Sequence, residues 1–205
     1  MYRLYGFFEP AAMTQEELAR CLALLPPDRR EKALRYGQEI DRKTSAAAYL
    51  LLLYALQREY GLQSPAIAAD ARGKMYLPER PDIHVNISHC PLGCVCAAAD
   101  HPVGVDIQDV RPYSRRLAAR CCAESELRAL NASDEPALLF TQMWAMKESF
   151  IKMTGEGLGR DVRTVDTTRL QDKIDTMIRG NCCIAVSDAA NFENDPFIYR
   201  TELED

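Results

Sequence analysis

The sequence predicts an α+β fold built from two strand-and-helix halves, with a boundary near residue 102. Two observations predict it. A long apolar helix over residues 41–60 precedes period-two segments between residues 83 and 110, and a second long helix over 134–154 precedes further short segments of this kind. The 205 residues, 47% of them hydrophobic, can bury one large core or two smaller ones. We therefore expect an N-terminal half at 1–102 and a C-terminal half at 103–205.

The N-terminal half is expected to begin with a strand and two short helices. Residues 2–8 are predicted to form the strand. Thr14–Glu17 has the Thr-x-x-Glu pattern of a capping box and opens a helix that ends at Pro26. Asp28–Glu31 is predicted to be a second box, which opens the next helix.

The long helix over 41–60 is apolar nearly all round in its middle, and Gly61 ends it, so we expect it at the centre of this half. Three strands are predicted after it, at 83–88, 95–99 and 103–110. The last one alternates strictly. Its apolar face carries Val103, Val105 and Ile107, and its other face carries Gly104, Asp106 and Gln108. Asp106 and Gln108 are thus two residues apart on one face, where both can reach one ion.

The C-terminal half is expected to continue with one or two short helices over 115–131 and a long helix over 134–154. Pro136 suits the first turn of the long helix, and Gly155 suits its end. A closing antiparallel set of strands is predicted at 162–165, 176–179, 182–186 and 197–203.

The long helix over 134–154 carries an unusual set of charges. At 100° per residue, one arc is apolar and consists of Leu139, Phe140, Met143, Met146, Phe150 and Ile151. Glu148 and Lys152 lie one turn apart on the polar edge, next to Trp144. Lys147 falls inside the apolar arc, where an ammonium is costly unless it reaches solvent or meets an anion. The simplest interpretation of Glu148 and Lys152 is a surface ion pair between residues i and i+4.

Composition excludes several classes of function. The net charge of −5 argues against a nucleic-acid partner, which requires a broad basic surface. The N-terminus lacks the pattern of a secretory signal. The longest uncharged apolar run, residues 46–56, has 11 residues, against the roughly 20 that span a bilayer. We expect a cytoplasmic protein without a membrane partner.

Eight cysteines raise the question of a zinc site or disulfides: Cys21, Cys90, Cys94, Cys96, Cys121, Cys122, Cys182 and Cys183. They form no Cys-x-x-Cys pair, and two pairs are neighbours in sequence. We expect them to be reduced and mostly buried, as small apolar residues.

Three segments together resemble the Sfp-type 4′-phosphopantetheinyl transferases. They are Asn86–His89, Gly104–Gln108 and Trp144–Lys152, in this order and at these separations. The resemblance extends to Arg30–Tyr36 and to Gly73 with Lys74, so it covers most of the chain up to about Gly159.

The resemblance implies transfer of phosphopantetheine from coenzyme A to a serine of an acyl or peptidyl carrier protein, with release of adenosine 3′,5′-bisphosphate. Such carrier proteins serve fatty acid, polyketide or nonribosomal peptide synthesis. The resemblance also implies two similar halves related by a pseudo-twofold axis, each an antiparallel sheet on a long helix. The active site then lies in the cleft between them. A monomer is expected, with Mg²⁺, or Mn²⁺ as the alternative, on the pyrophosphate.

Site residues follow from the matching positions. Asp106 and Glu148 are the expected metal ligands, with Gln108 as a weak or water-mediated third, because hard cations on phosphates use one or two carboxylates. Glu148 is the expected base for the serine proton, directly or through a water, and Lys152 is expected to assist catalysis. Lys147 and Lys152 would bind the coenzyme A phosphates.

Other side chains are expected around coenzyme A. Ser88 and His89 would hold a phosphate, although a histidine in isolation is more often structural. Lys32 and Arg29 would contact the 3′-phosphate, and Lys74 would lie on the adenine side. The remaining histidines, His84 and His101, are expected to be structural.

The chain departs from the family pattern at three positions. Gln108 stands where an acid is usual, which removes one charge from the metal site and weakens it. Met75 replaces the usual proline after Lys74. Thr44 stands where an arginine for the 3′-phosphate is usual, and Arg42 or Lys43 is a possible substitute.

Two other functions stay open at this point. One is a coenzyme A or carrier-protein binding module that has lost catalysis, suggested by Gln108. The other is an unrelated Mg²⁺-dependent phosphohydrolase. For a carrier protein, the expected docking residues are Arg115, Arg116, Leu117 and Arg120, whose alternative interpretation is a solvated helix face.

Overall fold

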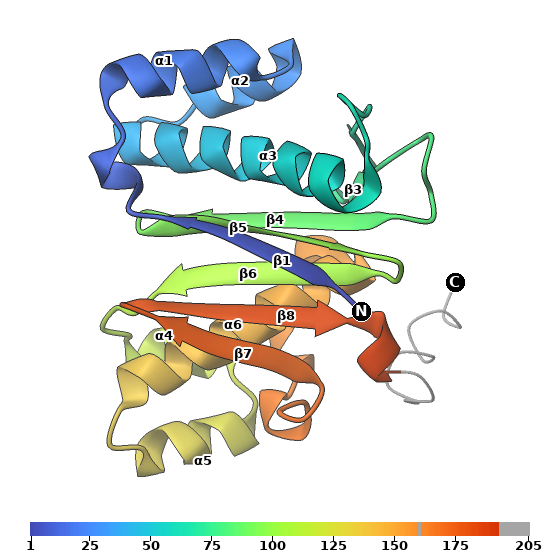
Figure 1. The fold of residues 1–205 in the computed structure, drawn as a ribbon. Helices are drawn as coiled ribbons and strands as arrows, with labels where there is room; N and C mark the ends of the chain where they lie inside the picture. Colours follow the sequence, from blue (N-terminus) through green and yellow to red (C-terminus); the bar gives the residue numbers. More distant parts are fainter. Residues whose placement is uncertain (160, 193–205) are drawn as a thin grey trace.

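The computed structural model describes residues 1–159 and 161–192. Its layers run helix, sheet, sheet, helix (Figure 1). The first half consists of β1 (Arg3–Phe8), α1 (Gln15–Leu24), α2 (Pro27–Leu34), α3 (Glu39–Tyr60), β2 (Ala68–Ala69), β3 (Met75–Tyr76), β4 (His84–Cys90) and β5 (Gly93–Ala99). Its antiparallel sheet has the order β1-β5-β4-β3-β2, and α3 packs on its outer face.

The second half consists of β6 (Val103–Asp109), α4 (Arg115–Cys121), α5 (Glu124–Ala132), α6 (Pro136–Thr154), β7 (Ile174–Arg179) and β8 (Cys182–Asp188). Its sheet has the order β6-β8-β7, again antiparallel, with α6 on the face away from the first sheet. The predicted α+β class, two antiparallel sheets each packed on a long helix, is confirmed. No helix in the described part of the chain is both long and apolar enough to cross a bilayer.

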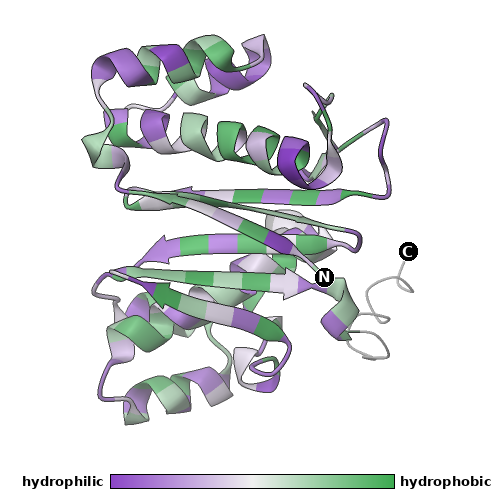
Figure 2. Cartoon of the chain, in the orientation of Figure 1, coloured by the Kyte–Doolittle hydropathy of each residue, from purple (hydrophilic) through white to green (hydrophobic). Residues whose placement is uncertain are grey.

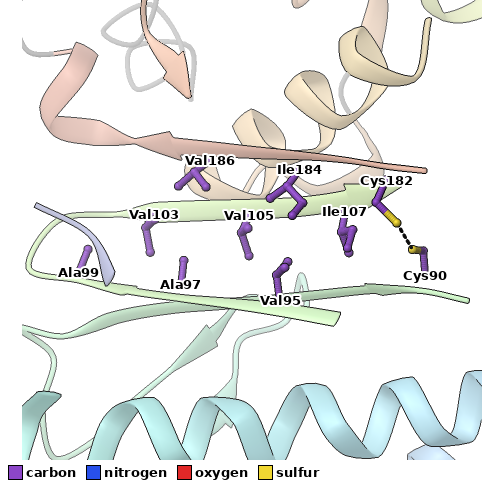
Figure 3. Close-up of a cluster of buried hydrophobic side chains, with 10 residues drawn as sticks. All are labelled: Cys90, Val95, Ala97, Ala99, Val103, Val105, Ile107, Cys182, Ile184 and Val186. Carbon is purple, nitrogen blue, oxygen red and sulfur yellow. Dashed lines mark hydrogen bonds between the residues drawn. The ribbon is translucent and has the colours of Figure 1, made fainter. Parts of the chain in front are cut away.

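The two sheets pack face to face over an apolar core. Alternate residues of β5, β6 and β8 supply it, as the period of two requires, together with Cys90 at the end of β4. Figure 3 shows the cluster, which consists of Cys90, Val95, Ala97, Ala99, Val103, Val105, Ile107, Cys182, Ile184 and Val186. The same alternation of apolar and polar residues is visible along β4 and β6 in Figure 2. The predicted inward face of 103–110 is therefore confirmed.

The cysteines are free thiols, and seven of the eight are buried. Cys90 Sγ and Cys182 Sγ, on facing sheets, are 3.9 Å apart. Burial raises the pKa of the Cys94 and Cys96 thiols to about 12, which keeps them protonated. The expectation that the cysteines are mostly buried is confirmed.

Of the two capping boxes predicted at the starts of α1 and α2, one is present in the structure and the other is absent. Thr14 forms the expected capping box: its Oγ1 accepts from Glu17 N at 3.2 Å, and Glu17 Oε2 accepts from Thr14 N at 2.7 Å. The second predicted box is wrong. Helix α2 begins at Pro27, and Asp28 lies within its first turn without capping it. Proline suits this position because its missing N–H is one that the helix leaves unpaired anyway.

The closing strands were predicted in part. β7 and β8 confirm the strands at 176–179 and 182–186, and α4 and α5 confirm two short helices before α6. The strand at 162–165 is wrong, because Val162–Thr164 forms a 3₁₀ turn capped by the Asp161 side chain. The strand at 197–203 lies outside the described residues.

Side chains of β4 join the two sheets at the free edge of β6. Val105 N donates to Asn86 Oδ1 at 2.9 Å, and Ile107 N donates to Ser88 Oγ at 3.3 Å. These two hydrogen bonds satisfy backbone N–H groups that have no neighbouring strand, because β6 is an edge strand. Because Asp106 lies between the two bonded residues of β6, these hydrogen bonds also fix its position.

Gly104 sets how closely α6 approaches β6. A Cβ at this position would overlap the backbone at Ser149 O and Met153 N. We predict that Gly104→Ala forces α6 away from β6 and lowers the free energy of unfolding by about 1–3 kcal/mol or more. Chemical denaturation measures this effect. Gly37→Ala is the matched control, since a Cβ there meets nothing within 4 Å; equal stability of the two variants would contradict the prediction.

Candidate active site

A buried carboxylate on β6 is the centre of the candidate site. Asp106 is 2% exposed. Its Oδ1 accepts from Ser88 Oγ at 2.7 Å and from Lys152 Nζ at 2.5 Å, and its Oδ2 accepts from Gln108 Nε2 at 2.8 Å. The structure thus brings together three segments that the sequence singled out, from β4, β6 and α6. The expectation that Asp106 and Gln108 share a face is confirmed.

Lys152 reaches this carboxylate from α6. Its ammonium also donates to Ser88 Oγ at 3.1 Å and to the backbone Val105 O at 3.2 Å. The sequence left open a simple surface pair between Glu148 and Lys152. Instead, Lys152 of α6 forms its ion pair with Asp106 of β6.

Glu148, one helical turn before Lys152, faces the same cavity as Asp106. The cavity measures about 390 Å³. Ile87, Ser88, His89, Asp106, Gln108, Trp144, Glu148 and Lys152 line it. Burial raises the pKa of Glu148, and the negative charge of Asp106 raises it further, whereas Lys152 opposes the shift. The two acids, far apart in the chain, therefore converge in one space and repel each other.

A second cavity, of about 430 Å³, shares Ile87, Glu148 and Lys152 with the first. Cationic side chains dominate its charge: Arg29, Lys32, Arg72 and Lys74. Lys74 Nζ donates to Met153 O of α6, and burial lowers the pKa of Lys74. Burial and then the charge of Arg29 lower the pKa of Lys32. This concentration of positive charge suits a polyanionic ligand.

Arg29 is held in this cavity by an aromatic ring. Its guanidinium carbon lies 4.8 Å from the centroid of the Tyr49 ring, a cation–π arrangement. Its Nε is buried and has no hydrogen-bond partner within the described residues. Arg72, in contrast, was not predicted as a site residue; its position beside Gly73 and Lys74 in a basic loop was the available signal.

His89 packs at the side of the cavity that lies toward the first half. Its Nδ1 is 3.2 Å from Thr44 Oγ1, and its Nε2 is 3.4 Å from the Tyr36 hydroxyl. Burial lowers the pKa of His89, which favours the neutral ring. Thr44, the departure from the family pattern, thus lies directly against the predicted phosphate-contacting histidine. Neither proposed substitute lines the two cavities: Arg42 Nε donates to Tyr36 O at 2.7 Å, and Lys43 pairs with Glu39 at 2.7 Å.

Lys147, which was predicted to bind coenzyme A, lines neither of the two cavities. Its side chain is 1% exposed and pairs with Glu126 at 2.8 Å. Its ammonium also donates to Val162 O at 3.0 Å and to Val165 O. The ammonium in the apolar arc does meet an anion, as its burial requires, but the anion is supplied by the protein itself.

Glu126 of α5, the partner of Lys147, was missed by sequence reasoning. Its Oε1 accepts from the amide of Thr167 at 2.9 Å and from the Thr167 hydroxyl at 2.5 Å, and its Oε2 accepts from Ala123 N at 2.6 Å. Every buried oxygen of this carboxylate is therefore bonded. The available signal was the spacing of Ala123 and Glu126 at a helix start, which resembles half of a capping box.

The donor set fits a divalent cation that is shared with a phosphate ligand. Within the described residues, no group of three or more His, Cys, Asp or Glu side chains could form an all-protein metal cage. Asp106 and Glu148 provide two carboxylates, and Gln108 provides an amide beside them. Mg²⁺ typically takes one or two carboxylates and completes its shell with water and phosphate oxygens. A cation would also oppose the burial of Glu148 and the repulsion from Asp106, which together raise the pKa of Glu148.

The chain was compared with protein families, curated proteins and solved structures. Residues 102–194 match the 4′-phosphopantetheinyl transferase superfamily. The 4′-phosphopantetheinyl transferase Sfp of Bacillus subtilis (strain 168) is 32% identical over 174 residues, which are 83% of this chain and 78% of that protein. The 4′-phosphopantetheinyl transferase ffp of Bacillus subtilis is 32% identical over 160 residues, 76% of this chain and 71% of that protein. The crystal structure of Thermotoga maritima holo-[acyl-carrier-protein] synthase aligns with a TM-score of 0.31 and 18% identity, over 42% of this chain and 60% of that one.

Proposed function

The chain belongs to the Sfp-type 4′-phosphopantetheinyl transferases, and from this membership we propose that it modifies a serine of an acyl or peptidyl carrier protein. The donor is coenzyme A, the transferred group is 4′-phosphopantetheine, and the leaving group is adenosine 3′,5′-bisphosphate. One observation carries the proposal: two acids and an amine converge in a cavity that shares Ile87, Glu148 and Lys152 with a second, strongly cationic cavity.

The cationic cavity is the proposed site for the nucleotide part of coenzyme A. That molecule carries a 3′-phosphate and a pyrophosphate, which match the positive charges of the cavity. Arg29 and Lys32 are assigned to the 3′-phosphate, and Lys74 to the adenine side. The unpaired Arg29 Nε supports its assignment, because a buried N–H without a partner favours an incoming acceptor.

The phosphates next to the reacting bond are assigned to Ser88, His89 and Lys152. The Ser88 hydroxyl donates to Asp106, and its oxygen accepts from Ile107 N and from Lys152, so it donates to a phosphate only when its O–H turns away from Asp106. A neutral His89 has one N–H, which it can donate to a phosphate oxygen in place of its contact with Thr44 or Tyr36. Lys152 places its charge where negative charge grows as the P–O bond of the donor breaks.

Asp106 and Glu148 are the proposed ligands of Mg²⁺, or of Mn²⁺, with Gln108 as a weak or water-mediated third. When bound, the cation supplies positive charge to the pyrophosphate. In the reaction, the serine oxygen forms a bond to the phosphorus of the phosphopantetheine phosphate, and the bond to the nucleotide breaks. Glu148 takes the serine proton directly or through a water. A bound cation would lower the pKa of Glu148 from the raised value it has in this structure and make it a weaker base, which favours the water relay.

The proposal is tested by mass spectrometry of an apo carrier protein incubated with the enzyme, coenzyme A and Mg²⁺. The expected result is a mass increase of one phosphopantetheine group, abolished by a chelator. If no carrier type gains this mass, the transferase proposal fails. Coenzyme A binding without product would then support the lapsed binding module, and cleavage of coenzyme A without a carrier would support a phosphohydrolase.

The proposed docking surface for the carrier protein lies on α4. Arg115, Arg116, Leu117 and Arg120 are exposed there. Leu117 lines a further cavity of about 280 Å³. This cavity shares Gln108 and Trp144 with the cavity that contains Asp106 and Glu148, so a carrier on α4 would be next to the reacting groups. An acidic carrier helix would complement these arginines.

Charge reversal tests this surface. Arg115→Glu combined with Arg116→Glu is predicted to raise KM for the carrier protein several-fold while KM for coenzyme A stays the same, because only the protein partner meets α4. Steady-state kinetics with each substrate varied in turn measures both constants. Arg58→Glu, at the exposed end of α3, is the matched control. An unchanged KM for the carrier would place the docking site elsewhere.

The division into halves at residue 102 is also a proposal. The strands of the first sheet come from residues 3–99, and those of the second from 103–188, in keeping with this boundary. Since one chain supplies both sides of the site, a monomer suffices for catalysis, and a cytoplasmic location suits a carrier-protein substrate.

A further inference from the structure

The ammonium of Lys152 has no N–H group to spare in this structure. A lysine ammonium carries three N–H donors. The three acceptors around Lys152 Nζ are Asp106 Oδ1, Ser88 Oγ and Val105 O. All three belong to β4 and β6, so the ammonium is turned toward the strands. In this position it cannot also donate to a phosphate of a bound nucleotide.

The oxygens of Asp106 are similarly occupied. Oδ1 accepts from both Ser88 and Lys152, and Oδ2 accepts from Gln108. A divalent cation on Oδ1 would sit next to the Lys152 ammonium, where the repulsion of like charges is strong because the carboxylate is buried. Oδ2 belongs to the same buried carboxylate, so a cation there also lies close to the ammonium, and the two compete for the Asp106 carboxylate.

We propose that Lys152 competes with the divalent cation for Asp106, and that its transfer to a phosphate of the nucleotide couples the binding of the two ligands. The inference rests on the proposed function, because it takes a metal and a coenzyme A phosphate as the ligands. Lys152 is able to make this move, since its side chain is 27% exposed and lines both cavities. The flexible side chain of Lys152 allows its ammonium to turn either toward Asp106 or toward a phosphate in the cationic cavity.

The coupling has a defined direction. A phosphate that accepts from Lys152 frees Asp106 Oδ1, so nucleotide binding strengthens metal binding. By linkage, the metal strengthens nucleotide binding by the same factor. The metal and coenzyme A therefore bind cooperatively. Lys152 is a positioning residue for the cation in addition to its role at the phosphates.

The experiment measures Mn²⁺ affinity by electron paramagnetic resonance in protein without nucleotide. We expect Lys152→Met to bind Mn²⁺ at least about tenfold more tightly than the unaltered protein, since the competing charge is gone. Addition of coenzyme A is expected to tighten Mn²⁺ binding less in Lys152→Met than in the unaltered protein. Lys152→Gln, which retains a polar side chain, serves if the methionine variant fails to fold.

Lys74→Met is the matched control. Lys74 lines the cationic cavity, but its ammonium donates to Met153 O and not to Asp106. We expect this variant to bind coenzyme A more weakly and Mn²⁺ alone with unaltered affinity. Equal Mn²⁺ affinities of Lys152→Met and the unaltered protein would overturn the inference, as would an equal gain in Lys74→Met.

The outcome is separable from that of the proposed function. An unaltered protein that modifies a carrier, together with Lys152 variants of unchanged Mn²⁺ affinity, overturns the competition alone. An unaltered protein that modifies no carrier, together with the expected gain in Mn²⁺ affinity, overturns the transferase proposal and leaves the competition at Asp106 supported.

Discussion

Glu148→Gln is expected to lower kcat for carrier modification by about 100-fold to 10,000-fold, the usual contribution of a positioned proton acceptor. Glutamine keeps the shape of the side chain but removes both the proposed base and one of the proposed metal ligands. Phosphopantetheine transfer to an apo carrier, followed by mass spectrometry at varied enzyme concentration, measures the loss. The rate is compared with that of Glu16→Gln, since Glu16 is an exposed residue of α1 remote from the site.

The same substitution is expected to leave stability unchanged or slightly improved. The pKa of Glu148 is raised in the folded protein, so the folded state binds the proton more tightly than the unfolded chain. Stability from this group is therefore lost as pH rises from the ordinary glutamate pKa through the raised one. Glutamine removes that cost at neutral pH. Full activity of Glu148→Gln would remove Glu148 from the mechanism, and a large fall in Tm would make its activity uninterpretable.

Lys147→Met is expected to destabilise the protein by about 3–5 kcal/mol, because it leaves the Glu126 carboxylate buried without its partner. Both side chains are at most 1% exposed. For a domain of this size, each kcal/mol corresponds to about 2–4 °C in Tm. Differential scanning calorimetry measures the shift. If Lys147 bound a ligand phosphate instead, the variant would lose coenzyme A affinity and keep its Tm.

A second substitution in the same protein checks that the pair is the cause. Glu126→Gln added to Lys147→Met removes the unpaired charge. The loss in free energy of unfolding of the double variant is therefore expected to be smaller than the sum of the losses of the two single variants. Arg128→Met is the control, since Arg128 and Glu124 form an ion pair with both side chains exposed. Its Tm is expected to stay at the wild-type value.

Local patterns predicted much of the fold and the centre of the site. The period of two in 103–110 placed Asp106 and Gln108 on one face, and the period of 3.6 in α6 placed Glu148 beside Lys152. These are properties of neighbouring residues, which the sequence alone determines. The convergence of Asp106 with Glu148 was predicted from the family resemblance, not from periodicity.

What the sequence could not supply were contacts between distant segments. Lys147 was predicted to need an anion, but its partner Glu126 lies in another helix, and nothing local to Lys147 identifies it. The 3₁₀ turn at Val162–Thr164 has a β-branched composition typical of a strand, yet Asp161 caps it and its backbone carbonyl at Val162 accepts from Lys147. In both cases the tertiary structure decides the outcome.

The two hydrogen bonds that the Asn86 and Ser88 side chains accept from the backbone of β6 affect how mutations in this region are interpreted. A variant library screened for cellular yield and activity together would lose substitutions at both positions for reasons of assembly, whatever their effect on the reaction. Engineering of nucleotide preference is therefore better directed at Arg29, Lys32 and Arg72, whose side chains line the cationic cavity without bonding to the β6 edge.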